Sequence, residues 1–136
     1  MTASDSSYAP QAATPRRGRL LVIDDDVLVR VSLGHILSRD HEVTLCESGS
    51  HALDLFAEGK RFDAILCDIN MPGMDGPELY DRMSVVVPDQ LRRTIFLTGG
   101  AYTTRAQQFL ARIDNEQMEK PFEFEALRTA LACVMD

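Results

Sequence analysis

The chain has 136 residues, of which 45% are hydrophobic and 26% charged, and its formal net charge is -7. This length and composition are typical of one soluble globular domain with a core of its own. The acidic balance disfavours nucleic acid as a partner, and no apolar run approaches the ~20 residues that a membrane span needs.

The start of the chain differs in composition from the rest. It is rich in Ser, Ala, Pro, Gln and Thr and has no apolar period, which predicts a flexible leader at residues 1–18 and one folded domain at residues 19–136. The polar stretch Met1–Ser7 lacks the basic and apolar regions of a secretory signal. We therefore expect a cytoplasmic protein.

The first half of the domain predicts a strand, a helix, a strand and a second helix. Leu20–Ile23 is a continuous apolar run, and residues 29–37 carry apolar side chains at helical spacing. Glu42–Cys46 alternates apolar and polar residues, as a strand does. Ser48 or Ser50 is suited to cap the helix that follows.

The second half repeats this alternation. Ala64–Cys67 is another apolar run, and Pro77 suits the first turn of a helix that Pro88 ends. The remaining elements are a strand at Thr94–Leu97, a helix at about 103–111, a weak strand at 117–119 and a helix with Phe124, Leu127, Leu131 and Val134 on its apolar side.

Apolar strands that alternate with helices predict a parallel sheet covered on both faces, with right-handed crossovers. We therefore predict an α/β fold, a flavodoxin-like doubly wound (βα)5 domain whose five parallel strands have the order 2-1-3-4-5. In such a sheet, ligands bind at the carboxyl ends of the strands, where the strand order reverses. That point lies between the first and third strands.

Carboxylates follow these two strands. Asp24, Asp25 and Asp26 come after the first, and Asp68 comes after the third. Crowded carboxylates repel one another unless a cation neutralises them, and oxygen ligands suit Mg²⁺. The sequence therefore predicts a Mg²⁺ site at this edge, although Asp26 alone is better explained as the cap of the first helix.

Two further strands end in single polar residues, Thr98 after the fourth and Lys120, followed by Pro121, after the fifth. With the acids, this set and its order resemble the receiver domain of two-component response regulators over about residues 19–135. The resemblance implies a phosphoacceptor that takes a phosphoryl group from a phosphohistidine onto Asp68 and then switches partner binding. It also implies a signalling module that catalyses only its own phosphorylation and dephosphorylation, and is otherwise not an enzyme.

The resemblance assigns a role to each site residue. Asp25 and Asp68 coordinate Mg²⁺ directly, Asp24 acts largely through water, and the backbone carbonyl of Asn70 is a further ligand. Lys120 neutralises the phosphoryl oxygens, and receivers often hold the bond between this Lys and the following Pro cis.

Signal readout in the family depends on a hydroxyl and an aromatic residue. The Thr98 hydroxyl is expected to bind the phosphoryl group and move its loop. The aromatic residue with which this movement couples stands three places before the Lys, where this chain has Gln117, so the usual coupling is in doubt. Tyr102 is a candidate aromatic anchor on the partner surface.

The resemblance implies a sensor histidine kinase or a histidine phosphotransfer protein as phosphodonor. Because we expect no attached output domain, it also implies a separate downstream protein target. A free regulator, a phosphorelay intermediate and a receiver from a hybrid kinase all remain open. Two other functions fit in part. A haloacid-dehalogenase-type phosphatase would use Asp24 as nucleophile, but no Gly-Thr follows its Asp-x-Asp. A phosphorylation-independent binding module would keep the fold, but such receivers usually lose an acid or the Lys.

Overall fold

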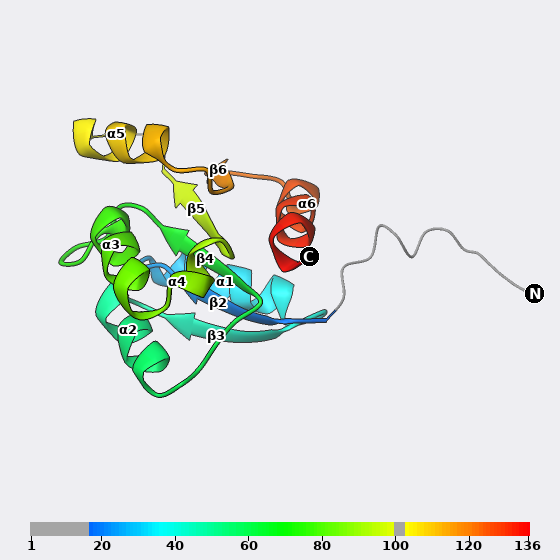
Figure 1. Ribbon diagram of the computed structural model, residues 1–136. Coiled ribbons are helices and arrows are strands. Elements are labelled where there is room, and N and C mark those ends of the chain that lie inside the picture. The colour runs from blue at the N-terminus through cyan, green and yellow to red at the C-terminus, as the bar shows by residue number, and fades with distance from the viewer. Residues whose placement is uncertain (1–16, 100–102) are drawn as a thin grey trace, which may run out of the picture.

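The computed structural model describes residues 17–99 and 103–136, so nearly all of the predicted leader lies outside the described residues. In this part of the chain, one parallel sheet contains β2 (Arg19–Ile23), β3 (Glu42–Cys46), β4 (Ala64–Asp68), β5 (Thr94–Thr98) and β6 (Gln117–Glu119). The spatial order β3-β2-β4-β5-β6 is the predicted order 2-1-3-4-5 counted along the chain (Figure 1). The predicted flavodoxin-like, doubly wound α/β fold is therefore confirmed.

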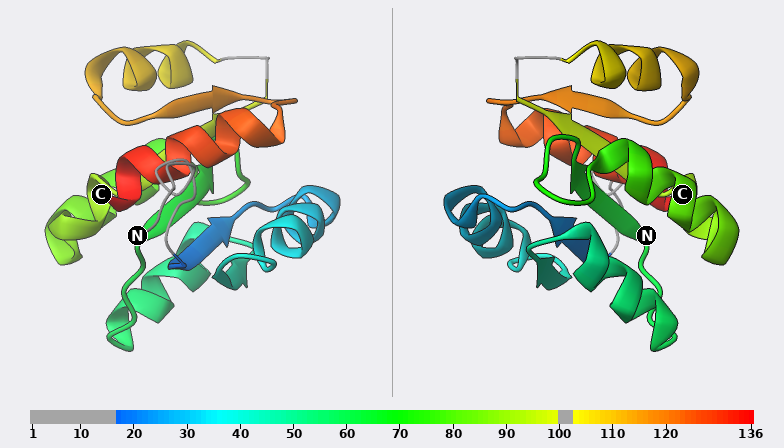
Figure 2. Two further views of the ribbon diagram at one scale, coloured as in Figure 1. Left: turned by 90° about the vertical axis from the view of Figure 1, so that its right-hand side faces the viewer. Right: turned by 90° about the vertical axis from the view of Figure 1, so that its left-hand side faces the viewer.

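Helices cover both faces of this sheet (Figure 2). They are α1 (Val27–Leu37), α2 (Gly49–Ala57), α3 (Gly76–Val86), the short α4 (Pro88–Leu91), α5 (Thr104–Arg112) and α6 (Phe124–Met135). One core cluster joins the sheet to α1 and α6, and the other joins it to α2, α3 and α5.

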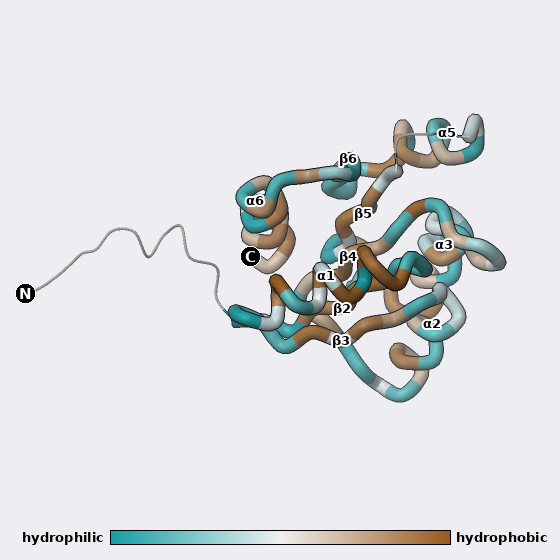
Figure 3. Tube along the Cα trace, turned by 180° about the vertical axis from the view of Figure 1, so that it is seen from behind, coloured by the Kyte–Doolittle hydropathy of each residue, from teal (hydrophilic) through white to brown (hydrophobic). Residues whose placement is uncertain are grey.

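Alternation along the strands divides the two clusters. Leu20 and Val22 of β2 belong to the cluster with α1 and α6, whereas Leu21 and Ile23 belong to the opposite cluster. All four side chains are at most 1% exposed. Figure 3 shows these apolar strands in the middle of the molecule, surrounded by helices of mixed hydropathy. The sheet is therefore fixed on both faces, and its carboxyl edge is a rigid platform.

Two element boundaries differ from the sequence prediction in a way that matters for the site. Asp68 and Thr98 are the last residues of β4 and β5, not the first residues after them. Their backbones are therefore held by the sheet ladders. Pro88 does follow the end of α3, but it also opens the turn of α4, because proline is suited to the first position of a helix.

Side-chain caps begin the helices next to the acidic edge. Asp26 accepts hydrogen bonds from the backbone N–H groups of Leu28 and Val29, and Asp75 accepts one from Glu78 at the start of α3. The Asp26 cap was expected from the sequence and is confirmed. Because each cap ends a loop that carries acids, these bonds fix the loops as well as the helices.

Close backbone packing shapes the loop between β4 and α3. Gly73 has a φ of 78°, in the left-handed region that glycine adopts without strain. Gly76 donates its N–H to the Ile69 carbonyl at 2.9 Å, and a Cβ atom on Gly76 would lie 2.8 Å from the Ile69 Cα. Only glycine fits this approach without a shift of the backbone.

We predict that Gly76→Ala lowers the free energy of unfolding by roughly 1–3 kcal/mol, because the added methyl group meets backbone rather than a flexible side chain. Urea unfolding measures the change. Gly99→Ala is the matched control, since a Cβ there meets no described atom within 4 Å. Equal stabilities for the two variants would contradict the packing argument.

Candidate functional site

Three carboxylates meet at the carboxyl edge of the sheet. Asp24 and Asp25 follow β2, and Asp68 ends β4, the strand that pairs in parallel with β2. Each of the three side chains has an oxygen within 4.8 Å of the others. The structure thus brings together acids that are more than 40 residues apart in sequence.

These acids differ in exposure. Asp24 is 0% exposed and Asp68 is 6% exposed, whereas Asp25 lies at the surface. Burial raises the pKa of the Asp68 carboxyl to about 6; the nearby Lys120 ammonium opposes this shift, and Asp24 and Asp25 add to it by repulsion. The site therefore stores unfavourable electrostatic energy that a cation would relieve.

Lys120 reaches this cluster from β6, the last strand of the sheet. Its Nζ atom donates a hydrogen bond to Asp24 Oδ2 at 2.8 Å and lies 3.7 Å from Asp68 Oδ2. Its backbone N–H donates to the Thr98 carbonyl at 2.7 Å, and the peptide bond to Pro121 is cis. The amine is therefore held between two acids.

Thr98 and Asn70 complete the predicted set. Thr98 is 2% exposed, and its hydroxyl donates to the Met118 carbonyl at a long 3.4 Å. The Asn70 backbone N–H donates to Asp68 Oδ1 at 3.2 Å. Both residues therefore lie at the same edge as the acids, one on β5 and one in the loop after β4.

Gln117 is the one remaining predicted switch residue that the structure describes. Gln117 is exposed on β6, and its Nε2 atom donates to the Leu110 carbonyl in α5 at 3.0 Å. Gln117 thus links the sheet edge to a helix through a polar bond, in place of an aromatic contact. Tyr102 lies outside the described residues.

The donor set fits a hard divalent cation. Both oxygens of Asp24 already accept hydrogen bonds, Oδ1 from the Asp26 N–H at 2.9 Å and Oδ2 from Lys120. Asp25 makes no hydrogen bond or ion pair through its carboxylate with any described residue. Exposed, unpaired oxygens beside a buried acid are what Mg²⁺ takes as ligands while it keeps several waters.

Comparison with known proteins decides the family. The sequence model of the response regulator receiver domain matches residues 20–132. The chain belongs to the response regulator receiver family. Receiver domains are signalling modules of two-component systems.

Individual relatives span different lengths. Sporulation initiation phosphotransferase F of Bacillus subtilis is 28% identical over 114 residues, which are 83% of this chain and 90% of that protein. The transcriptional activator protein PfeR of Pseudomonas aeruginosa is 35% identical over 80% of this chain, but the match covers only 35% of that protein. A crystal structure of adenylate cyclase from Rhodopirellula baltica has 30% identity and a TM-score of 0.75, covering 88% of this chain and 87% of that one.

In this receiver, an ion pair that the sequence does not indicate connects α5 to the start of α3. Arg105 in α5 donates to both carboxylate oxygens of Asp75, at 3.0 Å and 3.2 Å. The pair holds the pKa of the Asp75 carboxyl below its usual value. Nothing in the sequence marks this pairing, because the two residues are 30 positions apart.

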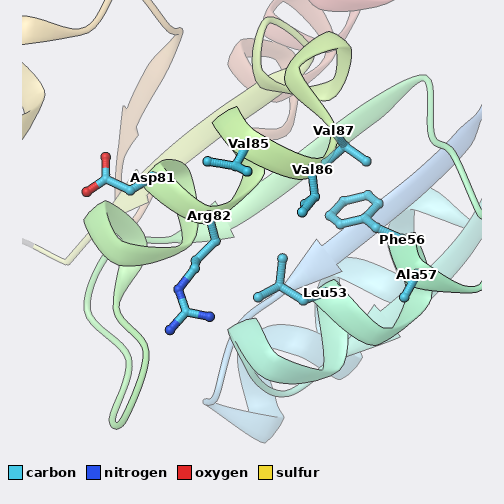
Figure 4. Close-up of a pocket in the computed structure, with 8 residues that line it drawn as sticks. All are labelled: Leu53, Phe56, Ala57, Asp81, Arg82, Val85, Val86 and Val87. Carbon is cyan, nitrogen blue, oxygen red and sulfur yellow. The ribbon is translucent and has the colours of Figure 1, made fainter.

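A separate apolar hollow of about 450 Å³ lies between α2 and α3 of the receiver. Figure 4 shows Leu53 and Phe56 of α2 on one side of it and Val86 of α3 on the other. Its lining holds no nucleophile or acid cluster, so it does not compete with the acidic edge as a site for phosphoryl chemistry. None of the helices formed by the described residues is long and apolar enough to span a bilayer.

We predict that Asp68→Asn stabilises the metal-free receiver above pH 6 by roughly 3 to 6 °C in melting temperature, corresponding to about 1 kcal/mol. The wild-type carboxyl has a folded pKa of about 6, above its usual 3.8, so the folded state binds the proton more tightly than the unfolded chain. Its destabilising charge is fully present above pH 6 and disappears as the pH falls towards 3.8.

Thermal melts of both proteins in a metal chelator at pH 8 and pH 4.5 measure the gain for Asp68→Asn. The gain is expected to be largest at pH 8. A gain that is the same at both pH values would show that the carboxylate charge is not its cause.

We predict that Lys120→Met lowers the free energy of unfolding by about 2–4 kcal/mol, because it leaves the fully buried Asp24 carboxylate without its cation. Adding Asp24→Asn should restore at least half of this loss. Urea unfolding of the two single variants and the double variant forms the cycle, with Lys60→Met as an exposed control. If the loss in the double variant equals the sum of the losses in the two single variants, Lys120 and Asp24 do not stabilise the fold as a pair.

Proposed function

We propose that this receiver accepts a phosphoryl group from a phosphohistidine onto Asp68, with Mg²⁺, and thereby switches the binding of another protein. The observation that carries the proposal is the position of the Asp68 carboxylate, which ends a central strand between the exposed Asp25 and the Lys120 amine. A nucleophile, a cation site and a fixed positive charge lie within one small volume.

The reaction follows from this arrangement. An Asp68 oxygen attacks the phosphorus atom, a P–O bond forms, the P–N bond to the histidine breaks, and the imidazole leaves with the bond electrons. Lys120 lies 3.7 Å from Asp68 Oδ2 and stabilises negative charge on the transferred oxygens. Asp25, Asp68 and the Asn70 carbonyl would hold Mg²⁺, with Asp24 acting through water, and the bound ion would supply further charge neutralisation.

Thr98 is proposed to report the modification. Its hydroxyl donates a hydrogen bond of 3.4 Å to the Met118 carbonyl. A bond this long is weaker than a hydrogen bond to a charged phosphoryl oxygen. Exchanging this bond for one to the phosphoryl group moves the end of β5. Gln117 joins β6 to α5, and Tyr102 stays a proposed anchor of the partner surface.

The surface around Asp68 suits a helical protein as phosphodonor. The exposed part of α1 carries Val27, Leu28 and Val31, which are 55%, 75% and 55% exposed. These side chains begin directly after the acidic loop, so a partner that covers them would bring its histidine to Asp68. We therefore propose a sensor histidine kinase or a histidine phosphotransfer protein as the phosphodonor.

Two rival functions have less support. A phosphatase using Asp24 as nucleophile would need a free carboxylate oxygen, and both Asp24 oxygens already accept hydrogen bonds in a side chain without solvent exposure. A binding module independent of phosphorylation would not need an exposed Asp25 carboxylate next to an Asp68 whose pKa is raised by burial. We therefore propose that the module catalyses only its own phosphorylation and dephosphorylation.

The test is intact-mass measurement after incubation with Mg²⁺ and acetyl phosphate, for the wild type, Asp68→Asn and Asp24→Asn. We expect the wild type to gain the mass of one phosphoryl group, Asp68→Asn to gain none, and Asp24→Asn to react more slowly. An adduct that survives Asp68→Asn and disappears in Asp24→Asn would support the phosphatase. A wild type that stays unmodified both with and without Mg²⁺ would instead support the phosphorylation-independent binding module.

A further inference from the structure

Arg30, the fourth residue of α1, points back towards the acidic loop. Its Nη1 atom donates to the backbone carbonyl of Asp24 at 2.7 Å, and the residue is half-buried. Its backbone N–H also donates to the Asp26 carbonyl at 3.0 Å, within the first turn of the helix. A short hydrogen bond from a charged donor thus ties α1 to the loop that carries the acids.

This bond acts on one particular peptide unit. The Asp24 carbonyl and the Asp25 N–H belong to the same planar peptide group. Holding the carbonyl therefore fixes the orientation of this peptide, from which the Asp25 Cα and side chain follow. The other polar groups of Asp24 are also engaged, since its N–H donates to the Cys46 carbonyl at 3.1 Å and its carboxylate accepts two hydrogen bonds. Asp24 is therefore fully immobilised.

Asp25 has no such support of its own. Its exposed carboxylate makes no hydrogen bond or ion pair with the described residues, so the direction of its side chain depends on the backbone behind it. Within the part of the chain that the structure describes, the one hydrogen bond to the Asp24 carbonyl comes from Arg30 in α1. The guanidinium forms no ion pair within 4.0 Å of Asp24, Asp25 or Asp68 in the described structure, so its part here is geometric.

We propose that Arg30 is a positioning residue of the cation site: by holding the peptide between Asp24 and Asp25, it holds the Asp25 carboxylate where a divalent cation needs it. The inference rests on the proposed function in one respect, that the cation at these acids is Mg²⁺. The charge of Arg30 opposes cation binding, whereas its hydrogen bond favours it. Removing the side chain therefore raises Mg²⁺ affinity if its charge matters more, and lowers Mg²⁺ affinity if its hydrogen bond matters more.

The experiment is a Mg²⁺ titration of the full chain at constant ionic strength, followed by amide chemical shifts, for the wild type, Arg30→Met and Arg30→Lys. We expect Arg30→Met to bind Mg²⁺ about fivefold to tenfold more weakly, a cost of about 1–1.4 kcal/mol. Arg30→Lys keeps one donor that can reach the carbonyl, and its affinity should return to within about twofold of the wild type. Affinity equal to or tighter than that of the wild type in folded Arg30→Met would overturn the proposal.

Arg39→Met is the matched charge control, because Arg39 is exposed beyond the end of α1 and loses the same charge. It should leave Mg²⁺ affinity unchanged, and a loss equal to that of Arg30→Met would also overturn the proposal. If Arg30→Met does not fold, Arg30→Gln replaces it, with weaker binding expected because its amide is too short to reach the carbonyl.

Failure of this inference is distinguishable from failure of the proposed function. A wild type that binds Mg²⁺ but gains no phosphoryl group from acetyl phosphate would contradict the function and leave the comparison of affinities intact. A wild type that is phosphorylated on Asp68, with unchanged affinity in Arg30→Met, would contradict only the role of Arg30.

Discussion

The organisation of the acidic edge depends on one buried ion pair, between Lys120 and Asp24. Its two residues are 96 positions apart, and the Asp24 side chain has no exposure to solvent. A carboxylate without water costs several kcal/mol unless a cation and hydrogen bonds compensate it. The burial of Asp24 after β2 therefore depends on Lys120, which follows β6. That strand has only three residues and must pair in register with β5 to place the amine.

Pairing one acid with the amine gives the three neighbouring carboxylates different chemistry. Asp24 is held on both oxygens, so it is a fixed negative charge rather than a reactive group. Asp68 is buried, with a pKa raised to about 6, so its charge is the one that binding of a cation relieves most. Asp25 lies at the surface, and its carboxylate oxygens have no hydrogen-bond partner among residues 17–99 and 103–136. Identical side chains thus differ because the fold gives each a different number of partners.

Pattern and order in the sequence were sufficient for the sheet and for the residues at its edge. Continuous apolar runs such as Leu20–Ile23 are strong signals for central parallel strands, and polar residues at their ends must meet once the strands align. The contrast between Asp24 and Asp25 was less accessible, because burial of one of two adjacent acids is decided by Lys120. The contacts of Arg30 and Arg105 were inaccessible: a backbone carbonyl as partner leaves no trace in side-chain identity, and an ion pair across 30 residues needs the tertiary register.

The contacts of α5 offer a route by which the proposed movement of Thr98 would be transmitted without an aromatic residue at position 117. Phe109 is 2% exposed and meets the rings of Tyr80 and Phe96 edge-on, each at 5.2 Å between centroids, which fixes the helix against the sheet. The ion pair from Arg105, by contrast, is largely exposed, and solvent screening makes such pairs weak. Phe96 lies two residues before Thr98 on β5, so a shift of that strand reaches α5 first through the buried ring. The polar contacts of α5 are exposed, so the buried ring is the contact best suited to carry the proposed shift.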